Sequence, residues 1–151
     1  AINGGTIVAS GTMAPEEGFD CDQNNFAIRG GTMIGTGGAS SSPTAASCTQ
    51  RSVLYKATGS SGTVVQVKSA TESVLVYRLP RTYSGGGGGG STASMTMLFS
   101  VPALTNATYY IVTNVTVTGG SEFRGYYTGA TVTGGKTSKT YTASSMLTTV
   151  N

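Results

Sequence analysis

Apolar and polar positions alternate along much of this chain, and one alternating segment occurs twice. Residues 2–8 read INGGTIV and residues 28–34 read IRGGTMI, so the pattern Ile-x-Gly-Gly-Thr-apolar-apolar recurs 26 residues further on. A weaker third copy, GTVVQV, lies at residues 62–67. Such a recurrence is typical of a β-solenoid, in which Gly-Gly forms a sharp corner and Thr starts the next strand. The alternative is a chance likeness between two glycine-rich corners.

The second half of the chain predicts shorter strands separated by turn signals. Alternating runs end at Pro80, at Pro102 and at two Gly-Gly steps. We expect strands at 73–79, 95–101, 109–113, 115–118, 139–142 and 147–150. The pattern therefore predicts a single all-β domain over residues 1–151. It is a right-handed parallel β-helix with repeat rungs at 1–70, followed by a β-rich, partly antiparallel C-terminal cap at 71–151 with a glycine-rich loop at 84–92.

Composition narrows the class of protein further. Charged residues make up 10% of the chain, 23 residues are Gly, and His is absent. Helix-forming residues are too scarce for a helical bundle, β-branched residues too frequent for a disordered chain, and no apolar run is long enough to span a membrane. Without His there is no Ser–His or Cys–His nucleophile pair and no His-ligated zinc. We therefore do not expect an enzyme.

Charge is distributed unevenly along the chain. Residues 1–50 carry a net charge of −3 and residues 51–151 a net charge of +6, which together give the overall +3. The basic side chains of the second part are spaced singly, whereas a nucleic-acid-binding surface needs a basic stripe or a recognised motif. We therefore expect no nucleic-acid partner.

Two cysteines, Cys21 and Cys48, are expected to form a disulfide, because the composition is typical of an extracellular protein. The alternative is two buried free thiols in a reducing compartment. The chain starts at Ala1, inside the repeat pattern and without an initiator Met. We interpret it as a processed piece of a longer precursor.

Four of the six carboxylates lie close together in the sequence, at Glu16, Glu17, Asp20 and Asp22. Calcium takes about six to eight oxygen ligands from side chains and backbone, and an acidic loop of this kind supplies such oxygens. The residues therefore predict a calcium site. The alternative is an acidic loop in solvent, since EF-hand spacing is absent.

Two tyrosine doublets are candidates for binding a sugar: Tyr109, Tyr110, Tyr126 and Tyr127. A tyrosine ring is apolar on its face and polar at its hydroxyl, which suits stacking on a sugar ring. Neighbouring side chains on a strand point to opposite faces, so we expect one ring of each doublet to be exposed and one buried. The alternative is that these rings pack in the core or at a protein interface.

Several segments resemble a known family. Residues 13–22 (MAPEEGFDCD), 28–32 (IRGGT), 119–130 (GGSEFRGYYTGA) and 144–150 (SSMLTTV) are similar to bacterial β-helix proteins known as carbohydrate-binding domain-containing proteins, from anaerobic, gut-type bacteria. The resemblance covers most of the chain. Family members are longer, and this chain resembles their C-terminal part. It implies a right-handed parallel β-helix with a β-rich cap and a secreted or cell-surface location. Calcium and acidic polysaccharide are the ligands it implies.

These observations lead to two functional hypotheses. The first is a non-catalytic, extracellular or cell-surface module that binds polysaccharide. The second is a structural subunit of an extracellular fibre, assembled head to tail through open solenoid ends. The fibre hypothesis depends on the apolar segment 2–9, which has no cap before it, and on the acidic and basic parts of the chain, which complement each other.

Overall fold

The computed structural model describes residues 1–84 and 94–151 and consists of strands joined by loops and two short 3-10 turns. Most of the glycine-rich loop expected at 84–92 lies outside the described residues. The strands are β1 (Ile2–Ser10), β2 (Ile28–Gly37), β3 (Ser52–Ala57), β4 (Val64–Lys68), β5 (Ser73–Arg78), β6 (Met95–Ser100), β7 (Thr108–Thr118), β8 (Ser121–Phe123), β9 (Tyr126–Thr128), β10 (Thr131–Thr142) and β11 (Leu147–Val150). Within these residues, no helix is long and apolar enough to cross a membrane.

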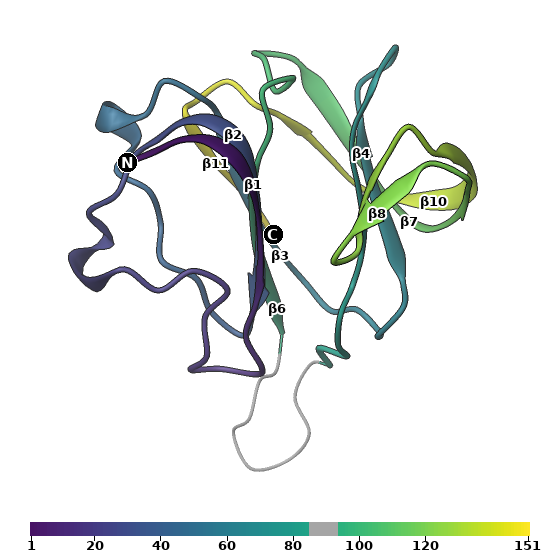
Figure 1. Cartoon of the computed structure of the whole chain (residues 1–151), viewed down its shortest axis with the longest axis horizontal. Coiled ribbons are helices and arrows are strands. Elements are labelled where there is room, and N and C mark those ends of the chain that lie inside the picture. Colours follow the sequence, from purple (N-terminus) through teal and green to yellow (C-terminus); the bar gives the residue numbers. More distant parts are fainter. Residues whose placement is uncertain (85–93) are drawn as a thin grey trace.

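The strands form two sheets that face each other as a β-sandwich (Figure 1). The five-stranded sheet has the order β1-β2-β6-β3-β11, and the six-stranded sheet has the order β10-β7-β4-β5-β9-β8. In the first sheet, β1 pairs with β2 and β3 with β11 in parallel, whereas β6 is antiparallel to both of its neighbours. In the second sheet every pairing is antiparallel.

The main core lies between the two sheets. The side chains of strand β6 alternate between this core and a second apolar environment. Phe99 faces the other sheet, and Leu98 faces away from it. The residues that meet Phe99 in the core come from both sheets and include Ile34, Val53, Val67, Tyr77 and Ile111. Leu98 belongs to a second, smaller cluster with Ile28 and Met33, against which Phe19 and Phe26 pack from the loop before β2. The middle of the five-stranded sheet, around β6, is therefore buried on both faces.

The predicted right-handed parallel β-helix is wrong, although the all-β class is right. The two repeat copies do lie side by side in parallel, with Thr6 opposite Thr32 and Val8 opposite Ile34. The parallel stacking stops there, because β6 from the second half of the chain pairs antiparallel with β2 at the position of a third rung. The third sequence copy forms β4 in the opposite sheet and pairs antiparallel with β5 and β7. Strands from both halves therefore mix in each sheet, and the described residues form no stack of rungs followed by a cap.

The glycine pair of the second repeat permits the close contact between β1 and β2. Gly31 has a φ of +86°, a conformation that side chains other than glycine rarely adopt. A Cβ atom at Gly31 would lie 2.6 Å from the carbonyl oxygen of Gly5, and one at Gly30 would lie 2.6 Å from that of Asn3. Gly30 and Gly31 must therefore be glycines, because β1 covers both of them.

We expect the stability of the sandwich to fall above about pH 10, the ordinary pKa of tyrosine. Burial raises the pKa of Tyr77 and of Tyr141, and the hydrogen bond from Thr36 opposes only part of the effect at Tyr77. Up to about pH 10 both phenols stay protonated in the folded and unfolded chain, so stability is complete. At higher pH the unfolded chain releases protons that the folded chain retains, and stability falls by up to about 1.4 kcal/mol per pH unit for each tyrosine.

Urea unfolding at intervals from pH 8 to pH 11 measures this loss, and Tyr141→Phe is its matched control. The Tyr141 hydroxyl is buried with no hydrogen-bond partner among the described residues, so its removal should raise the free energy of unfolding at pH 8 by about 1 kcal/mol. The variant should also lose stability less steeply at high pH. A free energy of unfolding that is flat up to pH 11 would contradict the expectation.

Candidate cleft on the open side of the sandwich

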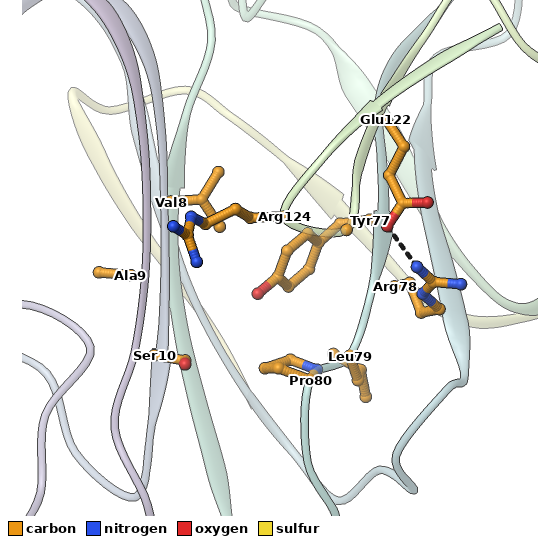
Figure 2. A pocket seen from close by; sticks show the side chains of 10 residues that line it. Val8, Ala9, Ser10, Tyr77, Arg78, Leu79, Pro80, Glu122 and Arg124 are labelled. Carbon is orange, nitrogen blue, oxygen red and sulfur yellow. Dashed lines mark hydrogen bonds and ion pairs between the residues drawn. The ribbon is translucent and has the colours of Figure 1, made fainter.

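A cleft of about 480 Å³ lies where the edges of the two sheets approach each other (Figure 2). One wall is the end of β1, and the other is formed by the end of β5 with the β8–β9 hairpin. Its lining is mixed in character: Val8, Ala9, Ser10, Tyr77, Arg78, Leu79, Pro80, Glu122, Arg124 and Gly125. The volume is within the range of small-molecule sites, roughly 300–1,000 Å³.

The β8–β9 hairpin carries an arginine into this cleft. Its two turn residues, Arg124 and Gly125, have φ values of +49° and +90°, as a two-residue hairpin turn with both central residues at positive φ requires. Asn-Gly is the preferred sequence for such a turn, and arginine is uncommon in this conformation. The Arg124 side chain points into the cleft toward β1 in Figure 2.

The turn is fixed to strand β5 at Gly125. The Arg78 amide donates a hydrogen bond of 2.9 Å to the Gly125 carbonyl oxygen. A Cβ atom at Gly125 would lie 2.7 Å from the Arg78 carbonyl oxygen, so only glycine permits this approach. The hairpin is therefore held in a defined position, and with it the backbone of Arg124.

The second arginine of the cleft has its charge balanced. The Arg78 guanidinium forms an ion pair with the Glu122 carboxylate and lies over the Tyr127 ring, 5.8 Å from the ring centroid. Arg124 has no ion-pair partner within residues 1–84 and 94–151. Arg124 is therefore the uncompensated cation of the cleft, and an anionic group is the chemical complement of this position.

The floor of the cleft is rigid. Tyr77 is fully buried, and its hydroxyl lies 3.4 Å from the Thr36 hydroxyl across the sandwich, at hydrogen-bonding distance. Leu79 is also buried and belongs to the same core. A ligand in this cleft would therefore lie above this packed core and contact the accessible apolar side chains of Val8 and Pro80, with polar groups around them.

The structure does not bring the four predicted sugar-binding tyrosines into one site. Tyr109 is buried, stacks on Tyr141 with ring centroids 5.7 Å apart, and accepts a hydrogen bond of 2.9 Å from the Thr105 amide. Tyr110 is half-buried at a separate hollow on β7. Tyr126 and Tyr127 are half-buried on β9, which is separated from β7 in the sheet by β4 and β5. The Tyr127 ring contacts one cleft residue, Arg78, whose guanidinium lies over it.

The four acidic residues proposed for calcium lie on the loop between β1 and β2. Glu17 accepts a hydrogen bond of 2.8 Å from the Ser41 hydroxyl, whereas Glu16, Asp20 and Asp22 are exposed. No three His, Cys, Asp or Glu side chains converge as metal ligands in the described part of the chain. The residues as arranged do not fit a calcium ligand set, and we derive no function from a metal.

The expected Cys21–Cys48 disulfide is not formed in the structure, where both cysteines are free thiols. Cys48 is buried, and its sulfur accepts a hydrogen bond from the Ile28 amide and donates one to the Thr44 carbonyl oxygen. Cys21 is half-buried, and its thiol lies near the Asp22 carbonyl oxygen. Each thiol therefore has its own local partners.

Sequence reasoning missed the arginines and Glu122 as site residues. A signal was present in the segment SEFRGYYT at 121–128, where two short runs with aromatic residues flank an Arg-Gly pair. This is the arrangement of a two-residue hairpin, in which Arg takes the place usually occupied by Asn. The position of that hairpin beside β1 depends on the tertiary structure.

No protein-family model, curated protein or solved structure matches this chain. Its function is therefore argued from the chemistry of the cleft, because a β-sandwich by itself does not specify a function.

Proposed function

We propose that the protein is a non-catalytic carbohydrate-binding module, located outside the cell or on its surface, and that its cleft binds an acidic sugar. The observation that carries the proposal is Arg124, a cation without a partner at the tip of a fixed hairpin. A carboxylate or sulfate group on a sugar ring supplies the missing negative charge. The resemblance of the sequence to carbohydrate-binding proteins supports the same class of ligand.

The conformation of Arg124 also supports a binding role. Its positive φ is unfavourable for arginine and more favourable for Asn or Gly. Residues held in such conformations concentrate at functional sites, where the surrounding structure compensates for the strain. An arginine at a position that favours Asn is explained if the Arg124 side chain binds a ligand.

The other cleft residues suit a sugar ring. The hydroxyl of Ser10 and the Glu122 carboxylate are able to bond sugar hydroxyls, while Val8 and Pro80 contribute apolar surface. A charged group with a mixed polar and apolar lining is what an acidic sugar requires.

The experiment compares the binding of a galacturonate oligosaccharide to the intact chain, Arg124→Asn and Lys139→Asn, by isothermal titration calorimetry. Lys139→Asn removes the same charge on β10, at the opposite edge of the sheet. We expect Arg124→Asn to weaken binding about tenfold or more, because the ligand carboxylate loses its charge-assisted partner. Lys139→Asn should change binding less than twofold, since an exposed distant charge is screened by salt.

Stability separates loss of binding from loss of folding in this experiment. Asn tolerates the positive φ at position 124 better than Arg does, so Arg124→Asn should unfold at a temperature equal to or above that of the parent chain. A neutral galactose oligosaccharide of the same length tests the role of charge. Equal binding of the neutral and acidic sugars, or unchanged binding by Arg124→Asn, would refute the proposal.

A further inference from the structure

Strand β1 has one free edge. It pairs with β2 on one side, and on the other side no strand lies against it among the described residues. The amides of Ile2 and Gly11 donate hydrogen bonds to the β2 side, at 2.8 and 2.7 Å. Because backbone groups of alternate residues point to opposite edges of a strand, counting back from Gly11 places the amides of Val8 and Ser10 on the free edge. The edge is open at Gly4 and Gly5, whereas its Val8 and Ser10 end is a wall of the cleft, so a strand paired along the whole edge would occupy that side of the cleft.

The free edge of β1 resembles the edge of β2 against which β1 packs. Gly30 and Gly31 of β2 are covered by the backbone of residues 3–5, which leaves no room for a Cβ atom at either glycine. Gly4 and Gly5 occupy the equivalent positions of β1, and Gly5 has a φ of +83° against +86° at Gly31. A Cβ atom at Gly4 or Gly5 would nevertheless meet nothing within 4 Å. The first glycine pair thus has the shape of the covered pair without its cover.

We propose that the free edge of β1 is a docking site for a separate polypeptide segment of the same Ile-x-Gly-Gly-Thr pattern, added as a parallel strand. The β1–β2 pair demonstrates the contact within the chain, with Thr6 opposite Thr32, Ile7 opposite Met33 and Val8 opposite Ile34. A segment with the same pattern reproduces this register on β1: its own Gly-Gly step follows the bend, and its Thr continues the row of threonines.

A segment with the Ile-x-Gly-Gly-Thr pattern fits this edge better than a second copy of the chain does. In a second copy, the other outer strand of the same sheet is β11, which runs in the direction that parallel pairing with β1 requires. Strand β11 has only 4 residues and no glycine pair, whereas β1 has 9 residues. Strand β11 would therefore leave Gly4 and Gly5 uncovered.

The test uses a fluorescent synthetic peptide with the sequence of residues 26–37, FAIRGGTMIGTG, titrated with the intact chain and followed by fluorescence anisotropy. We expect saturable binding by the intact chain. The diagnostic variant is Gly4→Val, in which the new side chain has free space in the structure as it stands and an ordinary φ. Under a docked strand that side chain would meet backbone, as a Cβ at Gly30 does, so the peptide should bind about tenfold more weakly or worse.

Thr133→Val is the control, since Thr133 is exposed on β10 at the edge of the other sheet and the two side chains have similar shapes. It should bind the peptide within about twofold of the parent chain, and both variants should keep the parent melting temperature. Hydrogen exchange gives an independent readout: on peptide addition the Val8 and Ser10 amides should become protected. Absence of saturable binding, or equal binding by Gly4→Val, would overturn the proposal. Self-association of the intact chain that the peptide does not reverse would also overturn it, by assigning the edge to a second copy.

Discussion

Replacement of Phe99 by Ala should lower the free energy of unfolding by about 3–5 kcal/mol, the largest loss expected for a single core side chain of this protein. Phe99 is fully buried on β6, in the middle of the five-stranded sheet, with Ile34 on one side and Val53 on the other. Its ring fills the space between the two sheets. Truncation removes the contacts of the ring and leaves a cavity that two paired strands cannot close.

Urea unfolding of Phe99→Ala at pH 7 measures this loss, with Phe123→Ala as the control. Phe123 is 50% exposed on the β8–β9 hairpin, so its truncation should change stability by less than about 0.5 kcal/mol. A similar loss in the two variants would mean that the ring of Phe99 is not in the core between the two sheets.

Replacement of Gly31 by Val should destabilise the protein by about 4 kcal/mol and release β1 from the sheet. Two costs add at this position. A β-branched residue is strained at a φ of +86°, and its Cβ would lie 2.6 Å from the Gly5 carbonyl oxygen. Since Val8 and Ser10 on β1 form one wall of the cleft, the variant should also lose most of its binding to the acidic oligosaccharide.

Chemical unfolding and hydrogen exchange at the Ile7 and Ala9 amides, which counting back from Gly11 places on the β2 side, measure these two effects. The same substitution at Gly4 is the control, because a Cβ there meets no atom within 4 Å and the chain has an ordinary φ. If Gly31→Val proved as stable as Gly4→Val, the close approach of β1 and β2 would be incorrect.

The two glycine positions explain why the repeat predicted a real contact but the wrong fold. The recurring pattern identified two strands that pair in parallel through a Gly-Gly bend, and β1 and β2 do so. A solenoid needs this relation to continue from one segment to the next. Here the next partner of β2 is β6, whose six residues are all buried and whose two faces serve two different cores.

The residues of the candidate cleft were harder to predict than the strands. Glu122 and Arg78 are 44 positions apart in the sequence and meet only because β8, β9 and β5 are neighbours in one sheet. The tyrosine doublets looked like a set in the sequence, yet β7 and β9 are separated in the sheet by two strands. The acidic loop likewise places its carboxylates near one another in the sequence without directing them to one point.

By itself, the sequence determined the local structure of this protein. Strands β5, β6 and β11 begin and end within two residues of the segments expected from alternation, because alternation and the turn residues act over a few neighbouring positions. The tertiary structure alone decided which strands pair, that β7 runs on through Asn114 at a φ of +59°, and that β1 and the Arg124 hairpin enclose a cleft. The physical reason is that an alternating strand fits beside almost any other strand. Its partner is selected by burial of both sheet faces together, which involves residues from the whole chain.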